Sequence, residues 1–218
     1  MFAEKKMKTL LTCVLVLHIA SGFTALAFGL LAILSKKGLR AHLLTGRVFF
    51  WSMLLIAASA VVLSTFRLNI FLLLIAFFAF YNTISGYRSI RNKSLRPATV
   101  DWVITAVGLV TGILMISTLN IVLLVFGSLS LVLSINDIRA NILILKGGET
   151  PRFAWLIKHI GMMMGAYIAT FTAFVVVNIS YEAAPWLPWL APTMIGVPLL
   201  VLWQRKYANG LGKGNESL

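Results

Sequence analysis

The residues with the clearest capacity for cofactor chemistry are three histidines. His18 and His42 are each followed by a glycine four residues later, and His159 is followed by glycines two and six residues later. An imidazole beside a groove of small residues can ligate the iron of a haem that lies against the helix. The same residues also suit close helix packing, with the imidazole hydrogen-bonded to a neighbouring helix. The histidines therefore predict either a bound haem b or interhelical hydrogen bonds, and both alternatives stay open.

The depth of the histidines decides which of them could share a ligand. His18 lies about 16 residues from the far end of the first predicted helix, which is roughly 24 Å at 1.5 Å per residue. His42 and His159 both fall near helix ends on the opposite side. We therefore predict that His42 and His159 could hold one haem iron or one metal ion, with Asp101 or Asp137 as an oxygen ligand or as a hydrogen-bond partner of a ligand. His18 is a further candidate cofactor residue that does not share their ligand.

Asp101 and Asp137 also belong to polar stripes on three predicted helices. The stripes comprise Asn82, Gly86 and Ser89; Asp101 and Thr105; and Gly127, Ser130, Ser134, Asp137 and Asn141. Polar groups at membrane depth usually point into the protein or into a wet cavity, so the stripes indicate a path for a proton or a small solute. In the alternative interpretation, Asp101 and Asp137 only pair with Arg96 or Arg139 at the membrane surface.

All of these residues must be positioned by helices that cross a lipid bilayer. The 218 residues are 60% hydrophobic and 11% charged, whereas soluble domains are about 45–50% apolar and about 25% charged. A crossing takes about 20 apolar residues, and seven continuous apolar runs are long enough. They cover approximately residues 8–34, 48–66, 70–87, 99–119, 121–138, 154–179 and 187–204. We predict an all-α integral membrane bundle of about seven transmembrane helices, in a single domain over residues 1–218.

The two terminal runs need separate arguments. Lys5, Lys6 and Lys8 precede the first run like the start of a signal peptide, but the apolar core of a signal peptide has only 7–15 residues. The first run is longer, so we interpret it as a transmembrane helix. Prolines interrupt the last run, which we predict to be a kinked crossing, because neighbouring groups can satisfy the carbonyls that proline leaves free.

The basic residues predict the orientation of the chain. Fifteen Lys and Arg flank the segments that follow odd-numbered helices, and four flank the even-numbered segments. The positive-inside rule then places the N-terminus outside and the C-terminus in the cytoplasm of a cell inner (cytoplasmic) membrane. The net charge of +13 follows from this arrangement and from contact with anionic lipids, so nucleic acid is not expected as a partner. The bilayer is the predicted partner, with other membrane proteins or a second copy of the chain as further candidates.

Small residues at helical spacing predict which faces pack together. Helices in lipid associate through close contacts of Gly, Ala, Ser and Thr. The predicted contact stripes are Gly22, Ala25, Gly29 and Ala32; Gly108 and Gly112; and Gly161, Gly165, Ala169 and Ala173. His18 lies on the first stripe and is expected to face a neighbouring helix.

The segments around the histidines resemble a known bacterial family. His18 with its small residues, the sequence Ala-His-Leu-Leu-Thr-Gly-Arg-Val-Phe at 41–49 and the sequence Arg-Phe-Ala-Trp-Leu-Ile-Lys-His at 152–159 are similar to the "domain of unknown function 2306" membrane proteins. The family often has Arg and Tyr where this chain has Leu43 and Phe49. The resemblance implies a polytopic membrane fold and no defined reaction, so no catalytic residue is assigned.

Several classes of protein are excluded by what the sequence lacks. One cysteine, Cys13, cannot form a disulfide scaffold, three histidines cannot hold two bis-histidine haems, and the last run has no lysine for a retinal Schiff base. The P-loop, the dinucleotide glycine fingerprint and the common hydrolase motifs are absent. Three functions stay open: an accessory or structural membrane protein, which is the leading interpretation; a haem- or metal-binding redox protein; and a small proton-coupled transporter.

Overall fold

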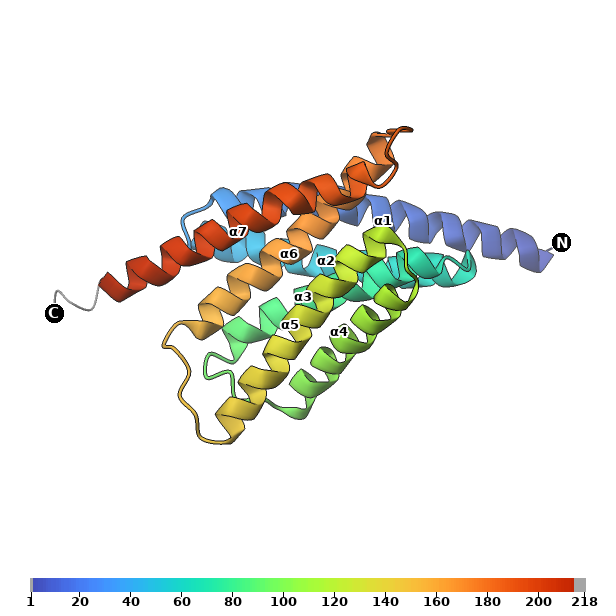
Figure 1. Ribbon diagram of the computed structural model, residues 1–218. Helices are drawn as coiled ribbons and strands as arrows, with labels where there is room; N and C mark the ends of the chain where they lie inside the picture. The colour runs from blue at the N-terminus through green and yellow to red at the C-terminus, as the bar shows by residue number, and fades with distance from the viewer. Residues whose placement is uncertain (1, 214–218) are drawn as a thin grey trace. The chain divides into compact units, whose positions relative to one another are not determined.

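The computed structural model describes residues 2–213, with side chains from residue 4 to residue 208. This part of the chain is all-helical (Figure 1). The helices are α1 (Phe2–Leu34), α2 (Arg40–Phe66), α3 (Ile70–Arg91), α4 (Thr99–Ser117), α5 (Ile121–Leu145), α6 (Ala154–Asn178) and α7 (Leu187–Lys213). Each is long and apolar enough to cross a membrane. The predicted fold class, an all-α membrane protein of about seven transmembrane helices, is confirmed.

Five of the seven helices, α1, α2, α3, α5 and α7, extend beyond the apolar runs that predict them. α2 begins at Arg40 instead of residue 48, and α5 continues to Leu145 instead of residue 138. Hydropathy identifies the segment that suits lipid, whereas a helix continues as long as its backbone is hydrogen-bonded, including through basic residues at its ends. α7 is continuous although Pro192 and Pro198 lie inside it.

The chain divides into two compact units, residues 1–80 and residues 81–218, which we call the N-terminal and C-terminal units. In the N-terminal unit α1 packs against α2. Ala25, Gly29 and Ala32 of the predicted stripe are buried, whereas Gly22 is half-buried. His18 faces α2 as predicted, because its Nδ1 is hydrogen-bonded to the Ser59 hydroxyl at 2.9 Å.

In the C-terminal unit α4 packs against α5, and α6 packs against α7. Gly112 and Gly127 let α4 and α5 approach closely, since a Cβ at Gly127 would lie 2.8 Å from the Met115 Cβ and 3.0 Å from the Gly112 carbonyl oxygen. Close contacts at glycine are the means by which helices associate in lipid, so the predicted role of Gly108 and Gly112 is confirmed.

The predicted stripe on α6 is only partly correct. Ala169 is buried, Gly161 and Gly165 lie against neighbouring side chains, and Ala173 is exposed. Four residues turn an α-helix by about 400°, so each step of four drifts by about 40°. Over the three steps from Gly161 to Ala173 the drift is about 120°, which takes Ala173 off the packed face.

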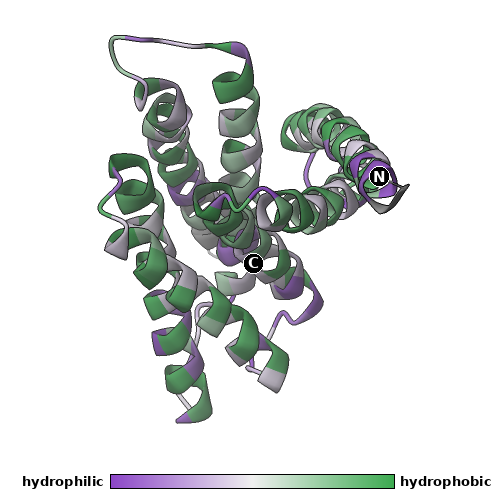
Figure 2. Cartoon of the chain, turned by 90° about the vertical axis from the view of Figure 1, so that its right-hand side faces the viewer, coloured by the Kyte–Doolittle hydropathy of each residue, from purple (hydrophilic) through white to green (hydrophobic). Residues whose placement is uncertain are grey.

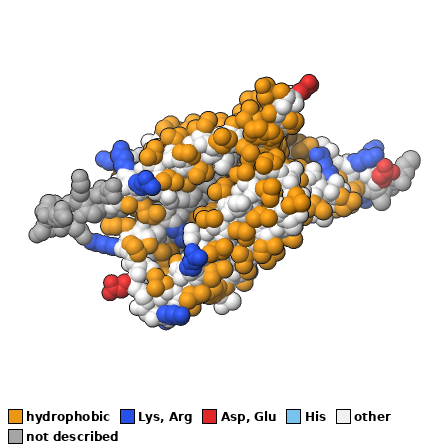
Figure 3. Space-filling model, in the orientation of Figure 1, with side chains coloured by type: hydrophobic (Ala, Val, Ile, Leu, Met, Phe, Trp, Pro, Cys, Tyr) orange, Lys and Arg blue, Asp and Glu red, His pale blue; other side chains and the backbone are white. Residues whose placement is uncertain are grey.

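Apolar side chains cover the outside of the helices, as expected for contact with lipid. Figure 2 shows hydrophobic residues along the helices and hydrophilic residues mainly in the links. Val103 and Val110 of α4 and Val132 of α5 are among the large apolar side chains that are more than half exposed. In Figure 3 such side chains form most of the visible surface of the helices, and Lys and Arg lie toward helix ends.

Candidate functional site

The C-terminal unit contains a buried carboxylate, Asp137, which is 6% exposed. Its Oδ2 accepts hydrogen bonds from the Tyr81 hydroxyl at 3.1 Å and the Ser85 hydroxyl at 3.3 Å, both on α3. Its Oδ1 lies 2.8 Å from the Lys158 Nζ on α6. Asp137 is eight residues before the end of α5, or about 12 Å along the helix axis. Two helices, α3 and α6, therefore supply the partners of one charged group that lies well inside α5.

A second ion pair lies nearer the helix ends. Arg88 of α3 binds both carboxylate oxygens of Asp101, with Nε–Oδ1 at 2.5 Å and Nη2–Oδ2 at 2.8 Å. Asp101 Oδ2 also accepts the backbone N–H of Ala98 at 2.9 Å, at the start of α4. Two parallel charge-assisted hydrogen bonds fix the guanidinium more firmly than one would. Asp101 thus ties α3 to the first turn of α4.

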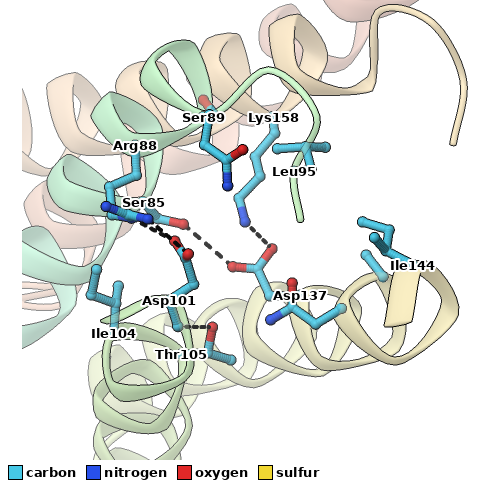
Figure 4. Close-up of a pocket in the computed structure, with 13 residues that line it drawn as sticks. Ser85, Arg88, Ser89, Leu95, Asp101, Ile104, Thr105, Asp137, Ile144 and Lys158 are labelled. Carbon is cyan, nitrogen blue, oxygen red and sulfur yellow. Dashed lines mark hydrogen bonds and ion pairs between the residues drawn. The ribbon is translucent and has the colours of Figure 1, made fainter. Parts of the chain in front are cut away.

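The two ion pairs line one small cavity (Figure 4). Its volume is about 40 Å³, and its polar lining residues are Ser85, Arg88, Ser89, Asn92, Asp101, Thr105, Asp137, Asn141 and Lys158. A water molecule needs about 10–15 Å³ of such volume, so the cavity suits a few waters or a solute of three to four heavy atoms. The side chains of Arg88, Asp101 and Lys158 remain 21–28% exposed, so the cavity is partly open.

Helical spacing explains how the sequence builds this cavity. Tyr81, Ser85, Arg88 and Asn92 are spaced by three or four residues, and so are Ser130, Ser134, Asp137 and Asn141. Such spacing keeps each set on one helix face. The polar face of α5 continues inward from Asp137, where the Ser134 hydroxyl donates to the Ser130 carbonyl and the Ser130 hydroxyl donates to the Gly108 carbonyl, both at 2.7 Å. The prediction that the polar stripes face the protein interior is confirmed, because their buried members are Asn82, Ser89, Thr105, Ser130, Ser134, Asp137 and Asn141.

The predicted partners of the two aspartates are wrong. Asp101 pairs with Arg88 instead of Arg96, and Asp137 pairs with Lys158 instead of Arg139. Arg139 follows Asp137 by two positions, which is about 200° around the helix, so it points to the opposite face and is exposed. Arg96 lies in the link before α4 and is also exposed. The structure does bring Asp101 and Asp137 to one cavity, as the polar stripes indicated.

Tyr81, Ser85, Arg88 and Lys158 were not predicted as site residues. The signal for three of them was present, since Tyr81, Ser85 and Arg88 lie on one face of α3. Lys158 has no such signal, because in the sequence it is one of many basic residues near a membrane boundary. Its role depends on the packing of α6 beside α5, which no local pattern specifies.

The histidine side chains each form a hydrogen bond through Nδ1. His42 is bonded to the Ala32 carbonyl at 3.0 Å in the N-terminal unit, and His159 is bonded to the Gly86 carbonyl at 2.9 Å in the C-terminal unit. A carbonyl only accepts, so Nδ1 donates a proton to the carbonyl in both rings. The same Nδ1–H contact to a carbonyl is typical of a histidine that ligates a metal through its other nitrogen.

The Ala32 carbonyl and the Ile33 carbonyl also accept hydrogen bonds from the Lys37 ammonium, which caps the end of α1. Desolvation by burial lowers the pKa of Lys37. The His42 imidazole and the Lys37 ammonium therefore share an acceptor at the turn between α1 and α2, and that contact orders the turn.

Within residues 2–213, no group of three His, Cys, Asp or Glu side chains is placed to hold a metal ion. Asp101 and Asp137 are each bound to a cation, and this use of the carboxylate oxygens competes with metal coordination. The pairing of His42 with His159 at one haem or metal stays a prediction.

The chain matches the family described as "Predicted membrane protein (DUF2306)" over residues 15–145. It belongs to this family. No curated protein and no solved structure shows significant similarity to it. The matched DUF2306 segment includes α2 to α5 and most of α1, and therefore Arg88, Asp101 and Asp137, whereas Lys158 and His159 lie beyond it. The protein is a multi-pass integral membrane protein, and family membership defines no activity for the cavity.

Proposed function

We propose that the protein is a small proton-coupled carrier whose proton and solute are handled by the cavity between α3, α4, α5 and α6. The observation that carries this proposal is the presence of two ion pairs, Arg88–Asp101 and Asp137–Lys158, around one polar cavity inside transmembrane helices. This function is favoured over the accessory role suggested by the sequence, because an accessory role does not account for a cavity lined by charged and polar side chains.

The energetics of buried charge support a functional role for the pairs. Removing two charges from water costs several kcal/mol per ion, so a buried ion pair is often no more stable than a well-packed apolar pair. Ionisable groups in membrane helices accordingly mark proton and solute pathways in many transporters. The hydroxyls of Tyr81, Ser130 and Ser134, all buried, extend the polar lining inward from Asp137 and offer hydrogen-bonding groups to a moving proton or solute.

We further propose that the cavity faces the cytoplasm and that the protein resides in the inner membrane. The C-terminal unit has eleven Lys and Arg, and the links between α4 and α5 and between α6 and α7 contain none. The positive-inside rule then assigns the opposite end, where α3 and α5 end and α4 and α6 begin, to the cytoplasm. In the N-terminal unit four basic residues flank each end of the α1–α2 pair, so their count favours neither orientation. The proposed orientation therefore depends on the basic residues of the C-terminal unit.

Proton flux in reconstituted vesicles tests the carrier function. Purified protein in liposomes that contain a pH-sensitive dye is supplied with an outward or inward gradient of small amino, carboxylate or sugar solutes. We expect one solute class to drive proton movement, and Asp137→Asn to reduce the initial rate at least tenfold. Arg139→Gln is the matched control, because Arg139 lies on the exposed face of the same helix.

If no solute class moves protons while the folded protein co-purifies stoichiometrically with another membrane protein, the carrier proposal is wrong and the accessory role is supported.

The hydrogen bonds at Nδ1 of His42 and His159 favour a haem- or metal-binding role as a second candidate. A ligating imidazole typically donates its other N–H to a carbonyl or carboxylate, and His42 and His159 each have a carbonyl at Nδ1. The chemistry that a haem b would supply is one-electron transfer. An absorption spectrum of protein purified from haem-replete cells tests this candidate: a Soret band lost in His42→Ala or His159→Ala supports it, and its absence together with the absence of bound iron and copper contradicts it.

A further inference from the structure

We infer that the cavity binds a small monocarboxylate anion together with one proton, with Lys158 as the anion-binding residue and Asp137 as the proton-binding residue. This inference rests on the proposed carrier function and specifies the ligand of the same cavity. It follows from the two ion pairs of the cavity, in which Asp101 binds Arg88 and Asp137 binds Lys158.

In the structure, each cation of the cavity already binds a carboxylate of the protein itself. Arg88 is held by Asp101, and Lys158 is held by Asp137. The cavity therefore has two positive and two negative groups and no net charge. An external anion gains little from such a cavity unless one internal carboxylate is neutralised, because attraction to the cation is offset by repulsion from its partner.

The two pairs differ in how firmly the carboxylate is fixed. Asp101 makes two bonds to the Arg88 guanidinium and one to the Ala98 backbone N–H, so it is part of the first turn of α4. Asp137 has one ion-pair contact, to Lys158, and its other oxygen accepts from the Tyr81 and Ser85 hydroxyls. A hydroxyl can hydrogen-bond a neutral carboxylic acid as well as a carboxylate. The Asp137–Lys158 pair is therefore the one that can open without disrupting a helix terminus.

Protonation of Asp137 breaks the Asp137–Lys158 ion pair and changes the net charge of the cavity. A proton that binds Oδ1 of Asp137 neutralises the carboxylate, and the Lys158 ammonium then loses its ion pair. The charged and titratable groups that face Asp137 are Tyr81 and Arg88 from α3, Asp101 from α4 and Lys158 from α6. Since Arg88 stays bound to Asp101, the cavity has one net positive charge after protonation. One monovalent anion restores neutrality, so the loaded protein carries a proton and an anion with no net charge.

The size and donors of the cavity define the anion. The volume of about 40 Å³ admits three to four heavy atoms, which fits formate or acetate. The anion replaces the Asp137 carboxylate at the Lys158 ammonium, and a carboxylate reproduces its two acceptor oxygens. The side chains of Ser89, Asn92 and Asn141 also line the cavity and can donate hydrogen bonds to the second oxygen.

Calorimetric titration of the purified full-length protein with acetate tests this inference. The titrations are done between pH 6 and pH 8 in chloride-free buffers that differ in their ionisation enthalpy. We expect uptake of one proton per acetate bound and an apparent Kd that falls about tenfold for each unit by which the pH is lowered. Titrations with chloride and with methylammonium give the comparison with another anion and with a cation, and methylammonium is expected not to bind.

Two variants separate the roles of the residues. Asp137→Asn resembles the protonated state, so acetate should bind at pH 8 at least tenfold more tightly than to the unmodified protein, without proton uptake. Lys158→Gln should weaken acetate binding at least tenfold, and Lys158→Arg, which keeps the charge, should bind within about threefold of the unmodified protein. The last variant keeps the test valid if Lys158→Gln does not fold, and Arg139→Gln is the control.

The outcomes distinguish this inference from the carrier function. Acetate binding that does not depend on pH, or that survives Lys158→Gln, overturns the assignment of the two residues. Tighter binding of methylammonium than of acetate overturns the assignment of the ligand, and proton flux driven by another solute would leave the carrier function intact. Proton-linked acetate binding without any flux in vesicles would support the site and contradict the carrier function.

Discussion

The hydroxyl groups of Thr172 on α6 and Thr193 on α7 are buried, and neither has a hydrogen-bond partner among the described residues. A buried polar group without a partner retains the desolvation penalty that a hydrogen bond would offset, about 1–3 kcal/mol. Valine has nearly the shape of threonine but no hydroxyl. These two positions are therefore places where a polar residue lowers the stability of the C-terminal unit.

We expect Thr172→Val and Thr193→Val each to increase stability by about 1 kcal/mol, measured as a higher melting temperature in detergent. Thr170→Val is the matched control, because the Thr170 hydroxyl donates to the Ala166 carbonyl at 3.0 Å and its removal offers no such gain. Unchanged or lower melting temperatures in both test variants would show that these hydroxyls have partners in the folded protein.

The Arg88–Asp101 pair allows a second test at the residue scale. Removal of one partner leaves the other charge partly buried without compensation, whereas removal of both leaves none. Because both side chains keep 21–28% exposure, we expect Arg88→Gln alone to destabilise by about 1–2 kcal/mol. The double variant Arg88→Gln/Asp101→Asn should recover part of this loss. Thermal unfolding of the two single variants and the double variant gives the coupling, and additive effects would contradict a direct interaction.

At the scale of helices, hydropathy was enough to predict all seven, because a lipid-facing helix must be apolar around most of its circumference. The same principle explains the errors at the ends. Residues 40–47 and 139–145 contain basic residues that interrupt the apolar run, yet they are helical in α2 and α5. A helix that leaves the hydrocarbon region needs no apolar sequence, so hydropathy cannot predict its end.

The sequence predicts the candidate site only in part, because spacing along a helix fixes the direction of a side chain and not its partner. Period-3.6 spacing put Ser130, Ser134 and Asp137 on one face, and the expense of polar groups in lipid placed that face inside. The partners could not be predicted, because Lys158 meets Asp137 only through the packing of α6 next to α5. Spacing along one helix determines which way a side chain points, and helix packing determines what it meets.

The glycine contact between α4 and α5 leads to a prediction at the same scale. A methyl group at Gly127 would lie 2.8 Å from the Met115 Cβ and 3.0 Å from the Gly112 carbonyl oxygen, too close for either atom to accommodate without a shift of backbone. We expect Gly127→Ala to destabilise by about 1–3 kcal/mol and to lower the melting temperature.

Gly22→Ala in α1 is the matched control for Gly127→Ala, since no heavy atom lies within 4 Å of a Cβ at that position. There the better helix propensity of alanine, about 0.5–1 kcal/mol, should leave stability unchanged or slightly higher. Equal effects at the two positions would mean that the α4–α5 contact is looser than the structure indicates.

At the scale of the whole molecule, the basic residues are distributed unevenly along the chain. Eight exposed Lys and Arg lie at the end of the C-terminal unit that contains the cavity: Arg91, Lys93, Arg96, Arg139, Lys146, Arg152, Arg205 and Lys206. Lys93 lies over the Trp155 ring at 4.9 Å, and Arg152 lies over the Phe153 ring at 5.3 Å. Aromatic and basic residues together are typical of the membrane–water interface, so this end is expected to meet the lipid headgroups.

The orientation that follows can be tested with single cysteines, because Cys13 is the chain's one native cysteine. In a Cys13→Ser background, Glu182→Cys places a thiol in the link between α6 and α7, and Lys146→Cys places one after α5. Both positions are exposed. Since the link around Lys146 is basic and the link around Glu182 has no basic residue, a membrane-impermeant maleimide should label Glu182→Cys in intact cells. It should label Lys146→Cys only after the inner membrane has been permeabilised. The opposite pattern would place the cavity and its ion pairs at the outer surface, so that any proton bound by Asp137 would come from outside the cell.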